Sequence, residues 1–259
     1  MQNLLELHNL NVQYNDADAL TGVSFALAKG EILGIVGQSG SGKTTLINAI
    51  LNILPANAKL CAESMQYKDT DLLHLSQTGW RKLYGNEIGV IFQNPEAALN
   101  PLVRIRTQFK ETIRANSSVS HIQAAQIANN MLAKMQLPNP DEVLNSYPFQ
   151  LSGGMLQRVM IAMALSLSPS LIIADEPTSA LDAFTQKTII KEFSRLKDMH
   201  EIGMLFITHD IRVASYIADR LLVMHDGQII EQGQTQQLIA NPQHPYTKEL
   251  LANIISFDQ

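Results

Sequence analysis

Gly37-Gln-Ser-Gly-Ser-Gly-Lys-Thr44 satisfies the pattern G-x-x-x-x-G-K-[ST] at every fixed position. It lies between an apolar run at 31–36, typical of a buried strand, and a helical pattern at 45–53. Glycines let backbone N–H groups turn inward around an anion, and the helix that begins near Gly42 adds its positive dipole end. Lys43 can reach the β- and γ-phosphates, and the Thr44 hydroxyl can bind Mg²⁺. The context therefore favours a phosphate site over an ordinary glycine-rich turn.

The composition limits the class of protein. The chain has 259 residues, of which 46% are hydrophobic and 17% charged, so it can bury a core as one large domain or two small ones. A net charge of −5 argues against nucleic-acid binding by general electrostatics. The single cysteine, Cys61, excludes an internal disulfide framework and is typical of a reducing compartment. The first residues lack the basic start of a signal peptide.

The segment 159–174 is apolar enough to imitate a membrane span. It contains three serines and Pro169, which favour a helix ending near Ser168 and a buried strand from Leu171. We therefore expect a soluble chain that contacts a membrane only through partners.

Strand and helix patterns alternate along most of the chain. The exception is 102–137, which is helical with a break near 116–120, where Ser120 can cap the second helix. This predicts a helical insertion into an α/β chain, closed at 138–141, and Asp226-Gly227 predicts a hairpin turn near the end. Strands are predicted at 4–12, 19–27, 31–36, 59–67, 87–92, 171–174, 204–208, 220–225 and 228–232, and further helices at 76–83, 151–168, 183–200, 234–240 and 246–255.

Polar side chains follow several of the predicted strands. Asp175 ends one strand, where its carboxylate can hold Mg²⁺ directly or through water, and Glu176 can polarise an attacking water. Gln93 and His209 end two other strands. Each could be an ordinary strand-end residue, but parallel strands present their carboxyl ends to a ligand, so the phosphate loop favours a catalytic interpretation.

Leu151-Ser-Gly-Gly-Met-Leu-Gln-Arg158 predicts a second anion-binding helix start, with Ser152 as cap and two glycines behind it. One γ-phosphate does not need two such sites in one chain. In a dimer, each chain's second site could cover the nucleotide of the other. The alternative is a capped helix with a glycine lead-in.

The ordered set of motifs, over residues 4 to about 235, resembles the nucleotide-binding subunit of an ABC transporter. The resemblance identifies Tyr14 as the aromatic that stacks on adenine, 37–44 as Walker A, Gln93 as the Q-loop glutamine, 151–155 as the signature, 171–176 as Walker B, 179–182 as the D-loop and His209 as the switch histidine. It implies an α/β P-loop NTPase (RecA-like) core with an antiparallel β subdomain and an inserted α-helical subdomain. It also implies one domain over 1–259: a core at about 1–93 and 151–240, an insertion at about 94–150 and a tail at about 241–259.

The resemblance implies ATP and Mg²⁺ as cofactors and assigns the site residues. The catalytic residues are Glu176, His209 and Gln93; the nucleotide-binding residues are Tyr14, Gly37, Ser39, Gly40, Ser41, Gly42, Lys43, Thr44, Thr45, Ser152, Gly153 and Gly154; and the metal ligands are Thr44, Gln93 and Asp175.

Two further stretches, Gln93–Pro101 and Asn241–Leu251, resemble the oligopeptide, dipeptide and nickel importer branch. Met155 departs from the general signature, which has Gln there, but Met is common in this branch. The branch implies an ATP-hydrolysing subunit that powers import of peptides or of nickel and metal chelates, and the short ending resembles the nickel members more.

The implied partners are a second ABC ATPase subunit, related but not identical, two transmembrane permease subunits and an extracytoplasmic substrate-binding protein, with no nucleic acid. The implied location is peripheral, on the cytoplasmic face of the plasma (inner) membrane. The alternative is a non-transport ABC ATPase acting on nucleic acid or ribosomes; such proteins usually show tandem cassettes, basic arms or long coiled-coil insertions. A degenerate, non-enzymatic assembly subunit is disfavoured by Lys43, Asp175, Glu176 and His209.

Overall fold

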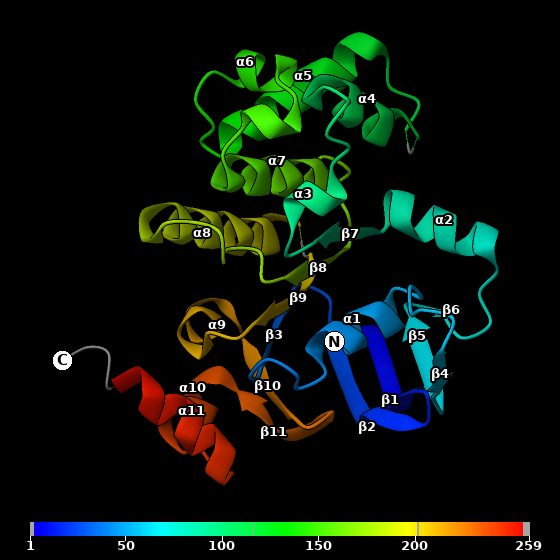
Figure 1. The fold of residues 1–259 in the computed structure, drawn as a ribbon, viewed down its shortest axis with the longest axis vertical. Helices are drawn as coiled ribbons and strands as arrows, with labels where there is room; N and C mark the ends of the chain where they lie inside the picture. Colours follow the sequence, from blue (N-terminus) through cyan, green and yellow to red (C-terminus); the bar gives the residue numbers. More distant parts are fainter. Residues whose placement is uncertain (1–2, 116, 201, 256–259) are drawn as a thin grey trace. The chain divides into compact units, whose positions relative to one another are not determined.

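A computed structural model describes residues 3–115, 117–200 and 202–255 (Figure 1). The chain forms two compact units. The first combines the chain up to Leu75 with the chain from Lys197 onward, and the second is Ser76–Leu196. The segments predicted to end in catalytic side chains are divided between the two units.

The first unit contains a parallel set of strands around β3 (Ile32–Val36), whose five residues are all buried. It pairs in parallel with β9 (Gly203–Thr208) on one side and with β10 (Arg220–His225) on the other. A strand covered on both faces is apolar throughout, which explains the uninterrupted run before the glycine loop. The predicted hairpin is confirmed: β10 pairs antiparallel with β11 (Gln228–Gln234) through a turn in which Asp226 and Gly227 have φ of 44° and 73°.

The same unit contains an antiparallel sheet, drawn in blue and cyan in Figure 1. Its long central strand β1 (Asn3–Tyr14) pairs with β2 (Ala17–Ala28), β4 (Ala58–Cys61) and β5 (Ser64–Tyr67). The prediction of a single strand at 59–67 is wrong, because the strand is interrupted between β4 and β5. In this interruption the Glu63 N–H donates to the His8 carbonyl. The remaining elements of this unit are β6 (Thr70–Asp71), α1 (Lys43–Ile50), α9 (Ile211–Ile217), α10 (Thr235–Ala240) and α11 (Pro245–Ile255).

The second unit pairs β7 (Ile88–Ile91) in parallel with β8 (Leu171–Asp175). Helix α7 packs on β7. Helix α5 packs on α7, as the green helices of Figure 1 show. Its helices are α2 (Gln77–Asn86), α3 (Pro95–Ala98), α4 (Ile105–Ala115), α5 (His121–Lys134), α6 (Pro140–Asn145), the 3₁₀ turn η1 (Pro148–Gln150), α7 (Gly153–Leu165) and α8 (Ala183–His200), the last running past the end of the unit.

The helical content of 102–137 is confirmed by α4 and α5. Ser120 caps α5 as predicted: its hydroxyl accepts from the Gln123 N–H at 3.3 Å, and the Gln123 side chain accepts from the Ser120 N–H at 2.9 Å. Asn116, in the predicted break, lies outside the described residues.

The apolar segment 159–174 divides into a helix and a strand, as expected. Helix α7 ends at Leu165, three residues earlier than predicted, and Ser168 adopts a φ of 51° before β8 begins at Leu171. Across residues 3–115, 117–200 and 202–255, we find no helix that combines the length and apolarity needed to cross a membrane.

Candidate functional site

The glycine loop joins β3 to α1 and depends on glycine at particular positions. A Cβ on Gly37 would lie 2.4 Å from the Met224 carbonyl oxygen and 2.6 Å from the Ser41 hydroxyl, so no side chain fits there. Gly40 and Gly42 have φ of 85° and 99°, in the left-handed region that other residues rarely adopt. These three glycines therefore fix the shape of the loop.

Lys43 is enclosed by this loop, with 8% of the residue exposed. Its ammonium donates to the carbonyl oxygens of Gly37 at 2.7 Å and Gln38 at 2.8 Å and to the Ser41 hydroxyl at 3.2 Å. The cation is thus held at the loop by the loop's own oxygens, where it can meet an anion.

Backbone donors of the loop are also available. Within the described part of the chain, the N–H groups of Ser39, Gly40 and Gly42 donate to no protein atom, whereas the Ser41 N–H closes a turn to the Gln38 carbonyl at 3.2 Å. Open N–H groups, a lysine and the start of α1 together form the cradle that phosphate requires. The predicted phosphate-binding residues are therefore contiguous in the structure.

The other predicted residues of the first unit lie at the ends of its elements. Thr44 and Thr45 occupy the first turn of α1, and Thr44 is exposed. Tyr14 is half-buried at the end of β1, opposite Ala17 and Ala58. His209 is exposed on the turn between β9 and α9.

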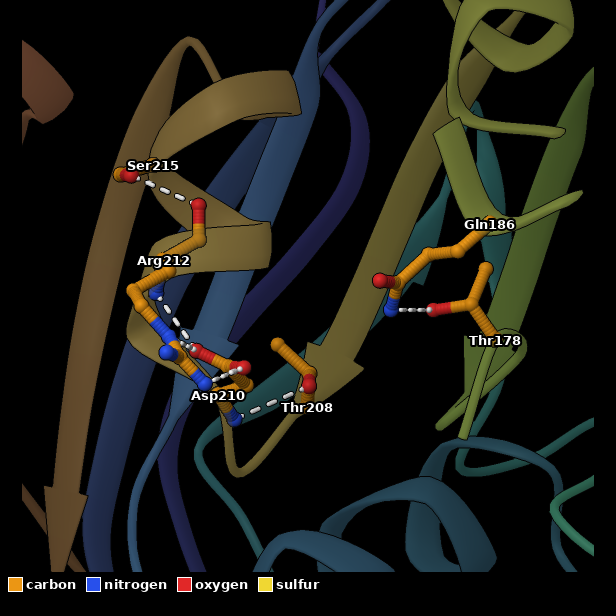
Figure 2. A network of polar contacts seen from close by, with 6 residues as sticks. All are labelled: Thr178, Gln186, Thr208, Asp210, Arg212 and Ser215. Carbon is orange, nitrogen blue, oxygen red and sulfur yellow. Dashed lines mark hydrogen bonds and ion pairs between the residues drawn. The ribbon is translucent and has the colours of Figure 1, made fainter. Parts of the chain in front are cut away.

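The turn that carries His209 is fixed by its neighbours, which sequence reasoning missed. Figure 2 shows the Asp210 N–H donating to the Thr208 hydroxyl at 3.1 Å and the Arg212 guanidinium donating twice to the Asp210 carboxylate, at 3.0 and 2.8 Å. The same carboxylate caps α9 by accepting the Arg212 N–H. Partial burial raises the pKa of Asp210, but the hydrogen bonds from Arg212 together lower it by more. The pKa of Asp210 therefore lies below its ordinary value. Asp210 therefore stays ionised and holds the turn.

In the second unit the structure brings Gln93 and Glu176 together. Their strands pair in parallel with Ile91 opposite Ala174, so each side chain follows two residues after a paired position. The Gln93 amide donates to the Glu176 carboxylate at 3.0 Å.

The backbone of Glu176 is unusual. Its φ is 45°, in the region where residues other than glycine are uncommon. The N–H and hydroxyl of Ser179 both donate to the Glu176 carbonyl, at 3.2 and 3.1 Å, which holds the turn in this conformation. The carboxylate is thus directed by local backbone geometry as well as by Gln93.

The predicted metal ligands Thr44, Gln93 and Asp175 supply a hydroxyl, an amide oxygen and a carboxylate. These hard oxygen donors suit Mg²⁺, which binds few protein ligands and completes its shell with phosphate and water. The described residues hold no group of three or more His, Cys, Asp and Glu that could bind a metal ion. Each of the three predicted ligands is therefore of a chemical type that suits a magnesium ion.

The predicted second anion site lies at the start of α7. The Ser152 hydroxyl accepts from the Met155 N–H at 3.3 Å, which confirms Ser152 as the cap. A Cβ on Gly153 would meet nothing within 4 Å, so packing inside this chain does not require glycine there. The exposed helix start leaves room for close approach by another molecule.

Two contacts that sequence reasoning missed fix the surroundings of this helix. Arg158 donates to the carbonyls of Gly154 at 3.3 Å and Gln136 at 2.9 Å, and burial lowers its pKa while Asp182 raises it. Figure 2 shows the Gln186 amide donating to the Thr178 hydroxyl at 3.0 Å, beside the segment 179–182. The Arg158–Gln136 contact joins residues 22 positions apart, so no local sequence pattern indicates it.

Residues 20–179 match the family described as ABC transporter. The chain is 40% identical to a probable peptide ABC transporter ATP-binding protein of Sinorhizobium fredii, covering 97% of this chain and 76% of that protein. It is 42% identical to a dipeptide transport ATP-binding protein of Caldanaerobacter subterraneus, covering 92% and 73%. A glutathione import ATP-binding protein of Salmonella typhimurium is 39% identical over 98% of this chain, which spans 42% of that protein.

Among solved structures, the chain resembles the dimeric ATP-binding cassette MJ0796 bound to ADP and Pi. The TM-score is 0.81 at 28% identity, and the match covers 89% of this chain and 98% of that one. The fold predicted from the motifs, an α/β P-loop NTPase, is therefore confirmed.

Proposed function

The chain belongs to the ABC transporter family, and on that premise we propose that it is the ATP-hydrolysing subunit of a peptide importer. Binding of ATP and its hydrolysis are the activities expected of a cassette of this family. The observation that carries the catalytic part of the proposal is the contact between Gln93 and Glu176, at adjacent ends of two parallel strands.

The proposed chemistry assigns a separate task to each residue. Lys43 and the N–H groups of Ser39, Gly40 and Gly42 hold the phosphates. Glu176 accepts the proton of the water that attacks the γ-phosphate.

Positioning and charge neutralisation fall to the remaining groups. Gln93 orients the Glu176 carboxylate through the hydrogen bond described above. Thr44, Gln93 and Asp175 hold Mg²⁺, which when bound neutralises charge on the phosphates. His209, on a turn fixed by Asp210 and Arg212, donates to the γ-phosphate. Tyr14 stacks on the adenine ring.

We further propose that two cassettes act as a dimer in which Ser152, Gly153 and Gly154 of each chain cover the nucleotide of the other. The open surface at Gly153 supports this, because no internal contact accounts for a glycine there. A similar cassette was solved as a dimer with ADP and Pi. The second cassette in this proposal is a related, non-identical chain.

The remaining partners in the proposal are two permease subunits and an extracytoplasmic substrate-binding protein, with the cassette bound peripherally at the cytoplasmic face of the membrane. The insertion at about 94–150 docks on a permease, and the loop Gln93–Pro101 transmits its motion. This loop contains α3, capped by Asn94, whose side-chain amide oxygen Oδ1 accepts from the backbone N–H groups of Glu96 and Ala97. Leu99 is buried, so Glu96–Ala98 are the positions open to a partner.

Reconstitution tests this function. The tagged chain is isolated with its membrane partners and placed in vesicles loaded with ATP and Mg²⁺, and uptake of labelled di- and tripeptides is compared with uptake of ⁶³Ni²⁺. We expect ATP-dependent peptide uptake that Lys43→Ala abolishes. Uptake of nickel alone would contradict the peptide assignment, and co-purification with ribosomes or nucleic acid instead of permeases would contradict the transport role.

A further inference from the structure

The segment Asn241–Leu251, near the end of the chain, is anchored on β11. The Glu231 carboxylate accepts from the backbone N–H of Gln243 at 2.7 Å and of His244 at 3.0 Å. The His244 ring nitrogen in turn accepts from the Tyr246 N–H at 3.2 Å, at the start of α11. These three contacts fix where Tyr246 lies.

Tyr246 connects this anchored segment to the phosphate loop. Only 8% of the residue is exposed, and its ring packs against that of His225 with centroids 4.0 Å apart. Its hydroxyl accepts from the backbone N–H of Gln38 at 3.0 Å. Gln38 is the second residue of the loop that encloses Lys43.

The contact holds one particular peptide group of the loop. The Gln38 carbonyl already accepts from Lys43 and from the Ser41 N–H, so the residue is held at its donor as well as its acceptor. The N–H groups of Ser39 and Gly40 are not used by Tyr246. Tyr246 and a bound phosphate therefore use different donors and do not compete.

We propose that Tyr246 is a positioning residue for nucleotide binding, through which the anchored segment Asn241–Leu251 holds the phosphate loop in its binding conformation. A loop that is already ordered loses less conformational entropy when the nucleotide binds, so the contact raises affinity. The inference rests on the ATP-binding role proposed above. It adds that the Glu231 anchor, which contacts no loop residue directly in the described contacts, also sets the affinity.

The test is Tyr246→Phe in the full chain, which removes the hydroxyl and keeps the ring against His225. Loss of one neutral hydrogen bond should weaken binding of Mg-ADP by about three- to tenfold in calorimetry. The KM for ATP should rise by a similar factor, while kcat at saturating ATP stays unchanged. Tyr216→Phe, at an exposed tyrosine of α9, is the matched control and should change neither quantity.

Glu231→Gln is the second variant, because it replaces one of the two carboxylate oxygens that accept from Gln243 and His244 by an NH₂ group, which cannot accept. It should also weaken Mg-ADP binding with kcat unchanged. A purely structural role would lower the melting temperature and leave the affinity unchanged well below it, and that result, or tighter binding, would overturn the inference. If the wild-type chain binds no nucleotide, the proposed function fails as well. If the wild type binds nucleotide and both variants bind it with the same affinity, this inference alone fails.

Discussion

Replacing Glu176 by Gln tests the catalytic assignment most directly. The amide keeps an oxygen that can accept from Gln93, so the contact at 3.0 Å and the turn held by Ser179 should persist. Only the ability to take a proton is lost. A general base contributes about 10²–10⁴ in rate, or about 2.7–5.4 kcal/mol in the activation barrier.

The rate loss expected for Gln93→Ala can be compared with that expected for Glu176→Gln. Gln93→Ala removes a hydrogen bond to a carboxylate, for which mutational series give about 1.5–3 kcal/mol. Both side chains are at least partly exposed to solvent, so the lower end applies, which corresponds to about tenfold in rate. Glu176→Gln should therefore slow hydrolysis at least about ten times more than Gln93→Ala does.

The assay is phosphate release at saturating ATP, with ATP affinity and melting temperature measured on the same preparations. Glu176→Gln should bind ATP as the wild type does, melt within about 2 °C of it and accumulate as an ATP-bound dimer, alone or with a sister ATPase. Glu111→Gln, an exposed position of α4, is the control for loss of a carboxylate. Near-normal turnover by Glu176→Gln would refute the role assigned to Glu176.

Further variants test the surrounding parts. Lys43→Ala should weaken ATP binding by at least about tenfold, because the phosphates lose a charge-assisted contact, and wild-type affinity in calorimetry would contradict this. Ser152→Ala should lower the melting temperature by about 2–4 °C, since an N-cap contributes about 1 kcal/mol; an unchanged value would show that the cap is not needed. The pKa of Asp210 is lowered, so its pair with Arg212 stabilises the fold above about pH 4, and this stabilisation is lost as the pH falls further. Arg212→Ala should therefore melt below the wild type at pH 7 and approach it as the pH falls below about 4, whereas a pH-independent gap would exclude the ion pair as the cause. Glu96→Ala should leave ATP binding unchanged and uncouple hydrolysis from uptake in the reconstituted importer; unchanged stoichiometry would contradict the coupling role of α3.

The sequence predicts long, strongly patterned elements well and short ones poorly. Helix α8 begins and ends where the pattern predicts, and all nine predicted strand regions contain strand. Helices α3, α6 and α9 have four to seven residues and were not predicted. Short helices show little periodicity, although α10, with six residues, was predicted at 234–240. Side-chain caps begin two of the missed helices, Asn94 at α3 and Asp210 at α9, whereas α6 has no side-chain cap.

In the candidate site, the sequence predicts the local features well and the contacts between distant residues poorly. The phosphate loop is readable because Gly37, Gly40 and Gly42 occupy positions that other residues cannot adopt, and chain order alone places Lys43 among them. The contact of Tyr246 with Gln38 joins residues 208 positions apart, so no window of the sequence contains it. The sequence of the tail indicates a resemblance to one importer branch, whereas its contact with the phosphate loop is visible only in the structure.

Glu176, the proposed general base, adopts a backbone conformation that is more typical of glycine. Its φ of 45° is a conformation that glycine adopts at lower cost, yet a carboxylate stands there. Such a conformation persists only where neighbouring contacts hold it, and here Ser179 bonds the carbonyl while Gln93 bonds the side chain. The observed strain, together with the directed carboxylate, supports a functional reason for the residue. A glycine at this position would relieve the backbone strain but would remove the carboxylate that we propose as the general base.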